Sequence, residues 1–162
     1  MLSIFATVAA SVVVATLIGH IVHWMLHKRW SGPFYRGHME HHLDHYPPGA
    51  LVSPAYKVPK WHRSGPVLFT PAFVIIVAVA GGLTYLLSLP LTLMATFGVT
   101  VLLFGLLNDT VHDAFHVEKS IVHKLPGFAK MRASHFLHHH NMRKNFGIIV
   151  FAWDRIFGTF RE

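Results

Sequence analysis

Ten of the fifteen histidines fall into four short boxes whose spacing suits the binding of metal ions. The pattern H-x3-H is followed by H-x2-H-H in the first half of the chain, and the same order recurs in the second half. Residues three and four positions apart lie on one face of a helix, so each box directs two or three imidazoles to the same side. The boxes contain His23, His27, His38, His41, His42, His112, His116, His135, His138 and His139.

Ten histidines provide five nitrogen ligands for each of two metal ions. Five ligands leave one position of an octahedron free for water or an oxygen species. The chain has no cysteine, which excludes a thiolate site, and imidazole alone does not distinguish iron, zinc, copper and nickel. One isolated box is more often a pair of surface histidines, but four boxes in paired order predict a two-metal site.

The other five histidines are expected at a membrane interface or in solvent: His20, His45, His62, His123 and His140. Two of them leave an alternative open. His20 lies three residues before His23 and could reach the metal shell. His140 would enter the last box if the register of that box moved by one residue.

A carboxylate also lies on the ligand face of the third box. Asp109 is one helical turn before His112, so it could accept an imidazole N–H and fix the orientation of that ligand. The alternative is a charge that only marks the end of an apolar span. Asp113 lies off the face shared by His112 and His116, and we expect it in solvent. Asp154 gives a weaker indication of a role.

The segments that carry the boxes are apolar and nearly free of charge. Hydrophobic residues make up 52% of the chain and charged residues 13%, whereas a typical soluble domain has about a quarter charged residues. No Lys, Arg, Asp or Glu occurs from Met1 to His27 or from Ser64 to Asn108. All fourteen Lys and Arg and all seven acids therefore lie in residues 28–63 and 109–162.

This pattern predicts an all-α integral membrane protein. A spanning helix needs about 20 apolar residues, so we predict three spans at Leu2–Val22, Val67–Leu87 and Leu91–Leu107. Pro90 suits the first turn of the last span, after a tight hairpin. The three transmembrane helices would be joined by cytoplasmic helices that carry the di-metal histidine cluster, in a single domain of residues 1–162.

The charges also predict the orientation. The hairpin tip is uncharged, so both basic stretches would face the cytoplasm, from a bacterial inner membrane or the endoplasmic reticulum. The net charge of +7 is separated from two long apolar blocks, which argues against a nucleic-acid partner. A cleaved signal peptide is the alternative for the first 20 residues, but these lack the usual positive start.

Between and after the spans we expect three kinds of segment. Five prolines predict an irregular, surface-lying loop over Leu43–Pro66. Residues Asp109 to His123 are predicted to continue the third span as helix. Gly127 to Asn141 is predicted to form a helix parallel to the membrane surface.

With these boxes in view, the chain resembles the fatty acid hydroxylase (sterol desaturase) superfamily. Phe34-Tyr35-Arg36-Gly37 before the second box is similar to the lead-in of that family, and residues 45–54 (HYPPGALVSP) are similar to the proline-rich link of acyl-chain 2-hydroxylases. Asn145-Phe146-Gly147 and residues 153–159 (WDRIFGT) resemble the closing motif. The resemblance covers most of the chain.

The resemblance implies a membrane monooxygenase in which the ten box histidines hold two iron ions. Zinc could replace iron in a purified form. The implied substrates are O2 and a membrane lipid, either a fatty acyl or a sterol-like one. The chain shows no fused cytochrome b5 domain, so electrons would come from a separate cytochrome b5-, ferredoxin- or reductase-type donor.

Three alternatives stay open. The short chain and the run Val111-His112-Asp113 also resemble β-carotene hydroxylases of the same superfamily, and a desaturase would use the same chemistry. The third alternative is a histidine-rich membrane metal carrier, which would place ionisable residues along its spans.

Overall fold

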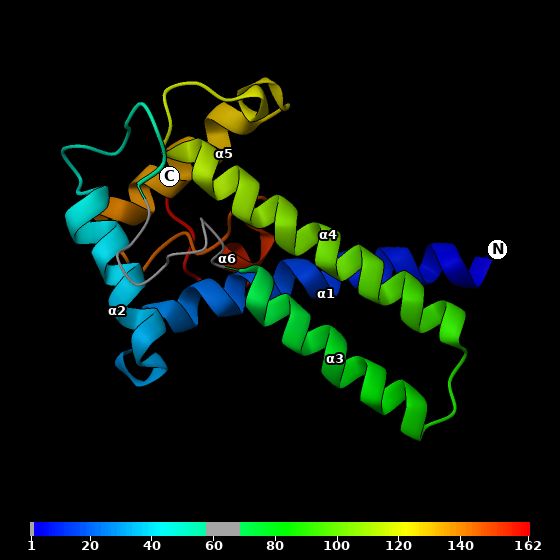
Figure 1. Cartoon of the computed structure of the whole chain (residues 1–162). Helices are drawn as coiled ribbons and strands as arrows, with labels where there is room; N and C mark the ends of the chain where they lie inside the picture. The colour runs from blue at the N-terminus through cyan, green and yellow to red at the C-terminus, as the bar shows by residue number, and fades with distance from the viewer. Residues whose placement is uncertain (1, 58–68) are drawn as a thin grey trace.

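The computed structural model describes residues 2–57 and 69–162, and in these residues the chain is helical with no β-strand. Three long helices, α1 (Leu2–Leu26), α3 (Thr70–Leu86) and α4 (Leu91–Phe115), extend to one end of the molecule, where the N-terminus and the α3–α4 turn lie (Figure 1). The helices α2 (Pro33–Glu40) and α5 (Phe128–His140) lie toward the other end, with the C-terminus. The predicted all-α fold is confirmed.

Two of the long helices have the length and composition to cross a membrane. These are Ser3–Leu26 of α1 and Leu91–Phe115 of α4, whereas the apolar helix α3 has 17 residues. Since a span needs about 17–25 residues, α3 is at the short limit. Val67 and Leu68, with which the second predicted span begins, lie outside the described residues.

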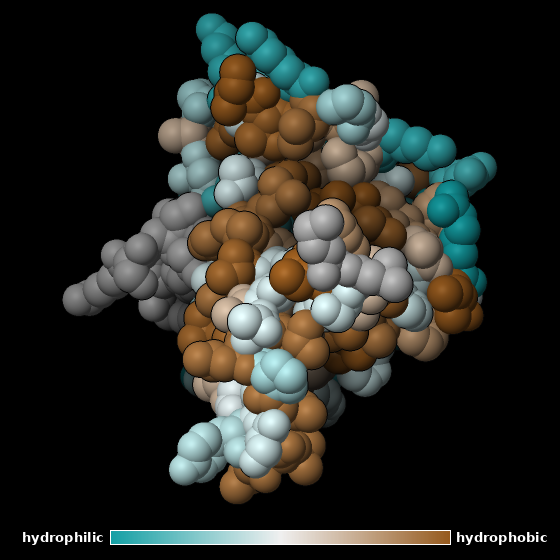
Figure 2. Space-filling model, turned by 90° about the vertical axis from the view of Figure 1, so that its right-hand side faces the viewer, coloured by the Kyte–Doolittle hydropathy of each residue, from teal (hydrophilic) through white to brown (hydrophobic). Residues whose placement is uncertain are grey.

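Large apolar side chains are exposed over the surface of these three helices. Seen from the end that carries the N-terminus, hydrophobic residues cover much of the face, and hydrophilic residues gather toward its upper and right margins (Figure 2). The exposed residues include Ile4, Phe5 and Val13 on α1, Ile75, Val79 and Leu83 on α3, and Val99, Leu103 and Leu106 on α4. Soluble monomers rarely expose so large an apolar area, so this surface suits contact with lipid tails.

Helix α4 packs against both α1 and α3, and its contact with α3 depends on glycine. Gly98 and Gly105 are two helical turns apart on the face of α4 that meets α3. A Cβ atom at Gly105 would lie 2.9 Å from Cγ of the buried Phe73, and one at Gly98 would lie 3.2 Å from Cγ1 of Val77. The two helices therefore approach closely, which fixes the position of the box at the end of α4.

The helix after the third apolar block is shorter than predicted. We expected Asp109 to His123 to continue as helix, but α4 ends at Phe115. The Ser53 N–H donates to the carbonyl of His116 at 2.9 Å, so the chain after α4 pairs with the proline-rich segment. A short 3-10 helix, η3 (Ile121–Lys124), follows this pairing.

The proline-rich segment is irregular only in part. Its first residues belong to a π-helical turn, η2 (His41–His45), which continues α2. Residues 46–57 are irregular, as predicted, and residues 58–66 lie outside the description. The expectation of a surface loop is wrong for Tyr46 and Ser53, which are buried because they pack beside the histidines. The predicted helix over Gly127–Asn141 is confirmed as α5.

Candidate metal centre

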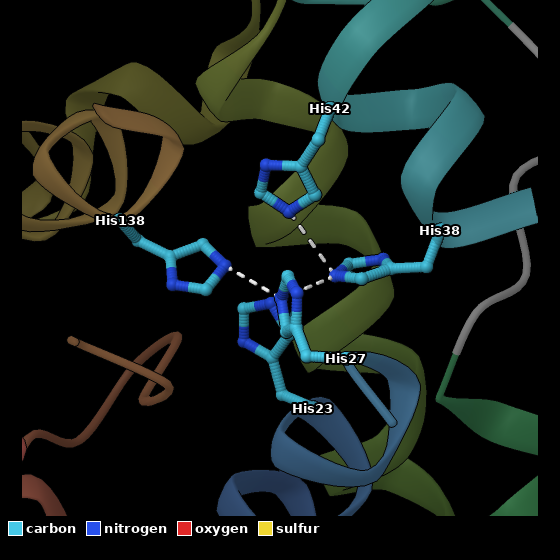
Figure 3. A group of neighbouring side chains, drawn as sticks. All are labelled: His23, His27, His38, His42 and His138. Atoms are coloured by element: carbon cyan, nitrogen blue, oxygen red, sulfur yellow. Dashed lines mark hydrogen bonds between the residues drawn. The ribbon is translucent and has the colours of Figure 1, made fainter. Parts of the chain in front are cut away.

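The structure brings the ten box histidines into two groups. Cluster one contains His23, His27, His38, His42 and His138, whose ligand nitrogens all lie within 4.8 Å of one another (Figure 3). In cluster two the same distance holds for His41, His112, His116 and His135, and the Nε2 of His139 lies 3.1 Å from the Nε2 of His135. His139 also groups with His41 and His42, so the two clusters adjoin. Each cluster therefore offers five imidazoles.

Each H-x2-H-H box contributes to both clusters. At about 100° per residue, residues i and i+4 are about 40° apart around a helix axis, whereas residue i+3 lies about 60° from residue i in the opposite sense. In the second box, His38 and His42 join cluster one and His41 joins cluster two. The fourth box mirrors this arrangement, because His138 alone joins cluster one. The spacing thus couples the two clusters through the helices that carry them.

Hydrogen bonds to backbone carbonyls fix the tautomer of four imidazoles. The Nδ1–H groups of His23, His138, His116 and His139 donate to the carbonyls of Phe146 (2.7 Å), Lys144 (2.6 Å), Leu51 (2.8 Å) and Tyr46 (2.9 Å), respectively. Because a carbonyl oxygen only accepts, Nδ1 carries the hydrogen and Nε2 keeps a bare lone pair. Metal-binding histidines almost always show this arrangement.

The Nε2 atoms of each cluster crowd together in a way that suits a bound cation. The Nε2 atoms of His116 and His139 lie 2.9 Å and 3.1 Å from the Nε2 of His135. His135 can donate at most one hydrogen from that atom, so at least one of the two neighbouring lone pairs has no hydrogen directed at it. In cluster one, the Nε2 of His27 lies 3.0 Å from the Nε2 atoms of both His138 and His38. A metal ion within each cluster would give these lone pairs a common partner, so the donor set fits a metal.

Burial keeps several of these imidazoles neutral. Nine of the ten box histidines are buried and His27 is half-buried. Burial, together with neighbouring imidazoles, lowers the pKa of His27 to about 2, and burial lowers the pKa of His139 to about 3. The pKa values of His38 and His135 are lowered well below the usual 6.5 for the same reasons. Neutral imidazoles are the form that binds metal.

The C-terminal segment holds cluster one. It supplies the Lys144 and Phe146 carbonyls that accept from His138 and His23. Asp154, at the start of the short helix α6 (Ala152–Ile156), accepts hydrogen bonds from the Phe146 N–H at 2.8 Å and the Gly147 N–H at 2.7 Å. Burial alone would raise the pKa of Asp154, but the hydrogen bonds to its carboxylate lower the pKa overall. The closing motif is therefore a support for the ligands.

Gly147 cannot carry a side chain in this support. A Cβ atom there would lie 2.8 Å from Oδ2 of Asp154 and would collide with the carbonyl oxygen of Val150. The glycine thus lets the segment close over the Asp154 carboxylate.

The proline-rich segment holds cluster two. Its Tyr46 and Leu51 carbonyls accept from His139 and His116. The Tyr46 ring is fully buried and stacks on the His116 ring with centroids 4.1 Å apart. The Tyr46 hydroxyl accepts from the Lys57 N–H at 2.6 Å, which anchors the far end of the segment.

Asp109 does not hold His112 as we predicted. Its Oδ1 accepts from the Phe69 N–H at 2.8 Å, and its Oδ2 accepts from the N–H and the hydroxyl of Thr70. These groups form the N-terminus of α3, where free N–H groups favour a carboxylate. Asp109 is therefore directed to the neighbouring helix, which the one-turn spacing to His112 did not reveal.

Asp113, which we expected in solvent, is the carboxylate beside that imidazole. Its Oδ1 lies 3.8 Å from the Nδ1 of His112, and its side chain is only 21% exposed. Tyr56 lies on the same side, with its hydroxyl 3.5 Å from the Nδ1 of His41. Burial and the Asp113 charge raise the pKa of Tyr56 well above its usual value of 10.0. The irregular segment that carries Tyr56 brings it to cluster two.

The histidines outside the boxes lie outside both clusters, as far as the structure describes them. The expectation of an interfacial or solvated side chain is wrong for His20, which is buried with its Nδ1 3.6 Å from Oδ2 of Asp154. His123 is half-buried and its Nε2–H donates to the Ala114 carbonyl. His140 is exposed, so the fourth box keeps its predicted register. His62 lies outside the described residues.

Sequence reasoning found the histidines but missed their supports. Four of these supports are backbone carbonyls, which every residue has, so the residue type does not reveal them. They belong to Tyr46, Leu51, Lys144 and Phe146. The closing motif that contains Asp154 and Gly147 was visible as a resemblance, but its role depends on tertiary contacts.

The comparisons with known proteins agree with the boxes. A family model described as fatty acid hydroxylase matches residues 8–159, which includes all ten box histidines and the closing motif. Searches of curated proteins and of solved structures find no match.

Proposed function

The chain belongs to the fatty acid hydroxylase family, and on this basis we propose that it is an integral-membrane hydroxylase that inserts oxygen from O2 into a membrane lipid at a di-iron centre. The family implies oxygenase chemistry on a lipid. The two clusters of five histidines support a site with two metals. The observation that carries the proposal is the convergence of Nε2 atoms in both clusters, for which a pair of cations would be the common partners.

Iron is the metal that suits the reaction. Bound iron would supply the redox chemistry for activating O2 and breaking an unactivated C–H bond, which zinc lacks. One oxygen atom enters the C–H bond, and the other leaves as water after taking up two electrons and two protons. The electrons would come from a separate donor protein of the cytochrome b5, ferredoxin or reductase type.

The residues of the chain hold the site where a lipid tail can reach it. His23 is near the end of the apolar helix α1, and His112 and His116 are at the end of α4. The clusters therefore lie where two candidate spans end, beside the exposed apolar surface. Burial of nine of the ten imidazoles excludes bulk water, which protects the reaction from competing steps.

We further propose three spans, α1, α3 and α4, with the clusters on the cytoplasmic side. The common end of the N-terminus and the α3–α4 turn supports this topology (Figure 1). A sterol-like or β-carotene-type substrate, or a desaturation, would use the same centre. A metal carrier is less well supported, because the ten imidazoles form two compact buried clusters, whereas a pathway would spread its ligands along the spans.

Comparison of lipid extracts tests the proposal. Cells that express the chain are compared by mass spectrometry with cells that express His135→Ala, under ordinary and heavy-isotope O2. We expect lipids heavier by one oxygen atom only with the unchanged chain, and the added atom should carry the isotope. Metal-loaded protein that leaves every lipid unchanged would overturn the proposal.

A further inference from the structure

A pocket beside cluster one combines a box histidine with two cationic side chains. It has a volume of about 520 Å³, and its walls include His27, Lys28, Tyr35 and Arg143. Ligand pockets commonly have about 300–1,000 Å³. His27 is also the one box histidine that is not fully buried. We call this the head pocket, because its polar groups lie next to the metal ligands.

A second pocket continues the head pocket toward the candidate membrane span. It has a volume of about 310 Å³ and shares Trp24 and Thr159 with the head pocket. Its other walls include Ile21, one turn earlier on α1, and the exposed Phe157. We call this the tail pocket. The two pockets adjoin at Trp24 and Thr159, and together they follow α1 from Ile21 to the box histidine His27.

The cations of the head pocket lack an acidic partner in the described chain. The Lys28 ammonium lies over the Trp24 ring at 4.4 Å, and no ion pair joins either Lys28 or Arg143 to a described residue. None of the seven acids of the chain lines the pocket. Lys28 follows the end of α1 by two residues, which is the depth of lipid head groups if α1 spans the membrane.

We propose that the head and tail pockets bind the substrate as an anionic amphiphile, with its carboxylate or phosphate at Lys28 and Arg143 and its acyl chain along the tail pocket. This inference rests on the proposed lipid hydroxylation and names the substrate class of that site. An uncharged hydrocarbon or sterol would leave both cations without a counter-charge. The charge of the pocket therefore favours an anionic acyl lipid over a carotenoid or a sterol.

Binding can be measured without turnover because Trp24 lines both pockets. The protein, in nanodiscs of zwitterionic phosphatidylcholine, is titrated with brominated hexadecanoic acid, the matching brominated alcohol, or brominated phosphatidylglycerol, and quenching of tryptophan fluorescence is followed. The Trp24→Phe variant identifies the part of the signal that comes from Trp24. Acid and phosphatidylglycerol distinguish a carboxylate from a phosphate head.

We expect at least one anionic probe to bind about ten-fold more tightly than the alcohol, since hydrogen bonds to a charged group contribute more binding free energy than hydrogen bonds between neutral groups. The double variant Lys28→Ala/Arg143→Ala should lose that preference, whereas Lys28→Arg/Arg143→Lys should keep it. The control Lys124→Ala/Lys130→Ala removes the same charge from exposed positions that line neither pocket and should behave as the unchanged chain.

Equal binding of the alcohol and both anionic probes would overturn the inference. So would a preference that survives Lys28→Ala/Arg143→Ala, or one that the control loses equally. Metal content measured on each variant shows that the clusters remain intact. If the unchanged chain oxidises a neutral lipid and shows no anionic preference, the proposed hydroxylation stands and this inference fails.

Discussion

The two clusters are built from the same boxes, but different parts of the chain support them. Cluster one depends on the C-terminal segment, in which Asp154 fixes the carbonyl that accepts from His23. Cluster two depends on the proline-rich segment, in which the Tyr46 ring and carbonyl hold His116 and His139. Cluster one is also open at His27, whereas every imidazole of cluster two is buried. The boxes therefore provide the imidazole ligands of both clusters. The supporting segments differ between the clusters, and they set how rigidly each ligand is held and whether the cluster is accessible from outside.

Loss of a ligand should give the largest effect. In His135→Ala, cluster two loses the imidazole that lies against both His116 and His139. We expect activity to fall by more than about 100-fold, because removing a supporting residue alone costs about 10–100-fold. Metal analysis and turnover of the purified protein measure this. The neighbouring His140→Ala, on the same helix but exposed, should retain both.

Removing a support of cluster one should weaken metal binding at that cluster more than at cluster two. Asp154→Asn keeps the shape of the side chain, but its amide offers one acceptor where the carboxylate accepts from both Phe146 and Gly147. We expect metal affinity at cluster one to fall by about 10–100-fold. Metal titration of the variant should then show one strong and one weakened site. Two equally weakened sites, or two unchanged ones, would contradict the separate supports.

Lowering the pH should destabilise the folded protein, because unfolding lets the buried histidines of both clusters bind protons. Unfolded histidines bind protons below a pKa of about 6.5, whereas His27 and His139 have folded pKa values of about 2 and about 3. Between these limits the unfolded state binds more protons, so the free energy of unfolding falls as the pH falls. We expect the metal-free protein to melt at lower temperature at pH 5 than at pH 7. A melting temperature that rises on acidification would contradict neutral, buried imidazoles.

Asp109→Asn should give the smallest effect and no difference between the clusters. Asp109 accepts from the first N–H groups of α3, so its replacement should lower the free energy of unfolding by about 1 kcal/mol, as for the loss of a helix cap. Affinity for both metals should stay within about two-fold of the unchanged chain, since the carboxylate accepts from Phe69 and Thr70 and neither ring nitrogen of His112 is hydrogen-bonded to it. Thermal melting and metal titration separate these outcomes. A loss of metal with unchanged stability would restore our first expectation for this residue.

The sequence predicted the parts that depend on local periodicity. The charge-free blocks predicted the apolar helices α1 and α4, and the box spacings predicted which ten histidines gather. Hydrogen bonds between residues that are distant in the sequence could not be predicted from local periodicity. After α4 ends at Phe115, the next residue pairs with Ser53, and Asp109 accepts from Thr70; both partners are distant in the sequence. Spacing within one helix suggested His112 as the partner of Asp109, but a neighbouring helix supplied it.

The sequence also did not predict how the ten histidines divide between the two clusters. The boxes predicted two metals with five ligands each, but not that His41 and His138 would each join the cluster opposite to their box neighbours. That division arises because two helices face each other across the site, which is a tertiary property.

Anomalous X-ray diffraction at the iron absorption edge, from crystals of protein purified with its iron, tests the central claim most directly. We predict two anomalous peaks per chain, one among His23, His27, His38, His42 and His138 and the other among His41, His112, His116, His135 and His139. A single peak, or peaks away from these imidazoles, would contradict the two-cluster account.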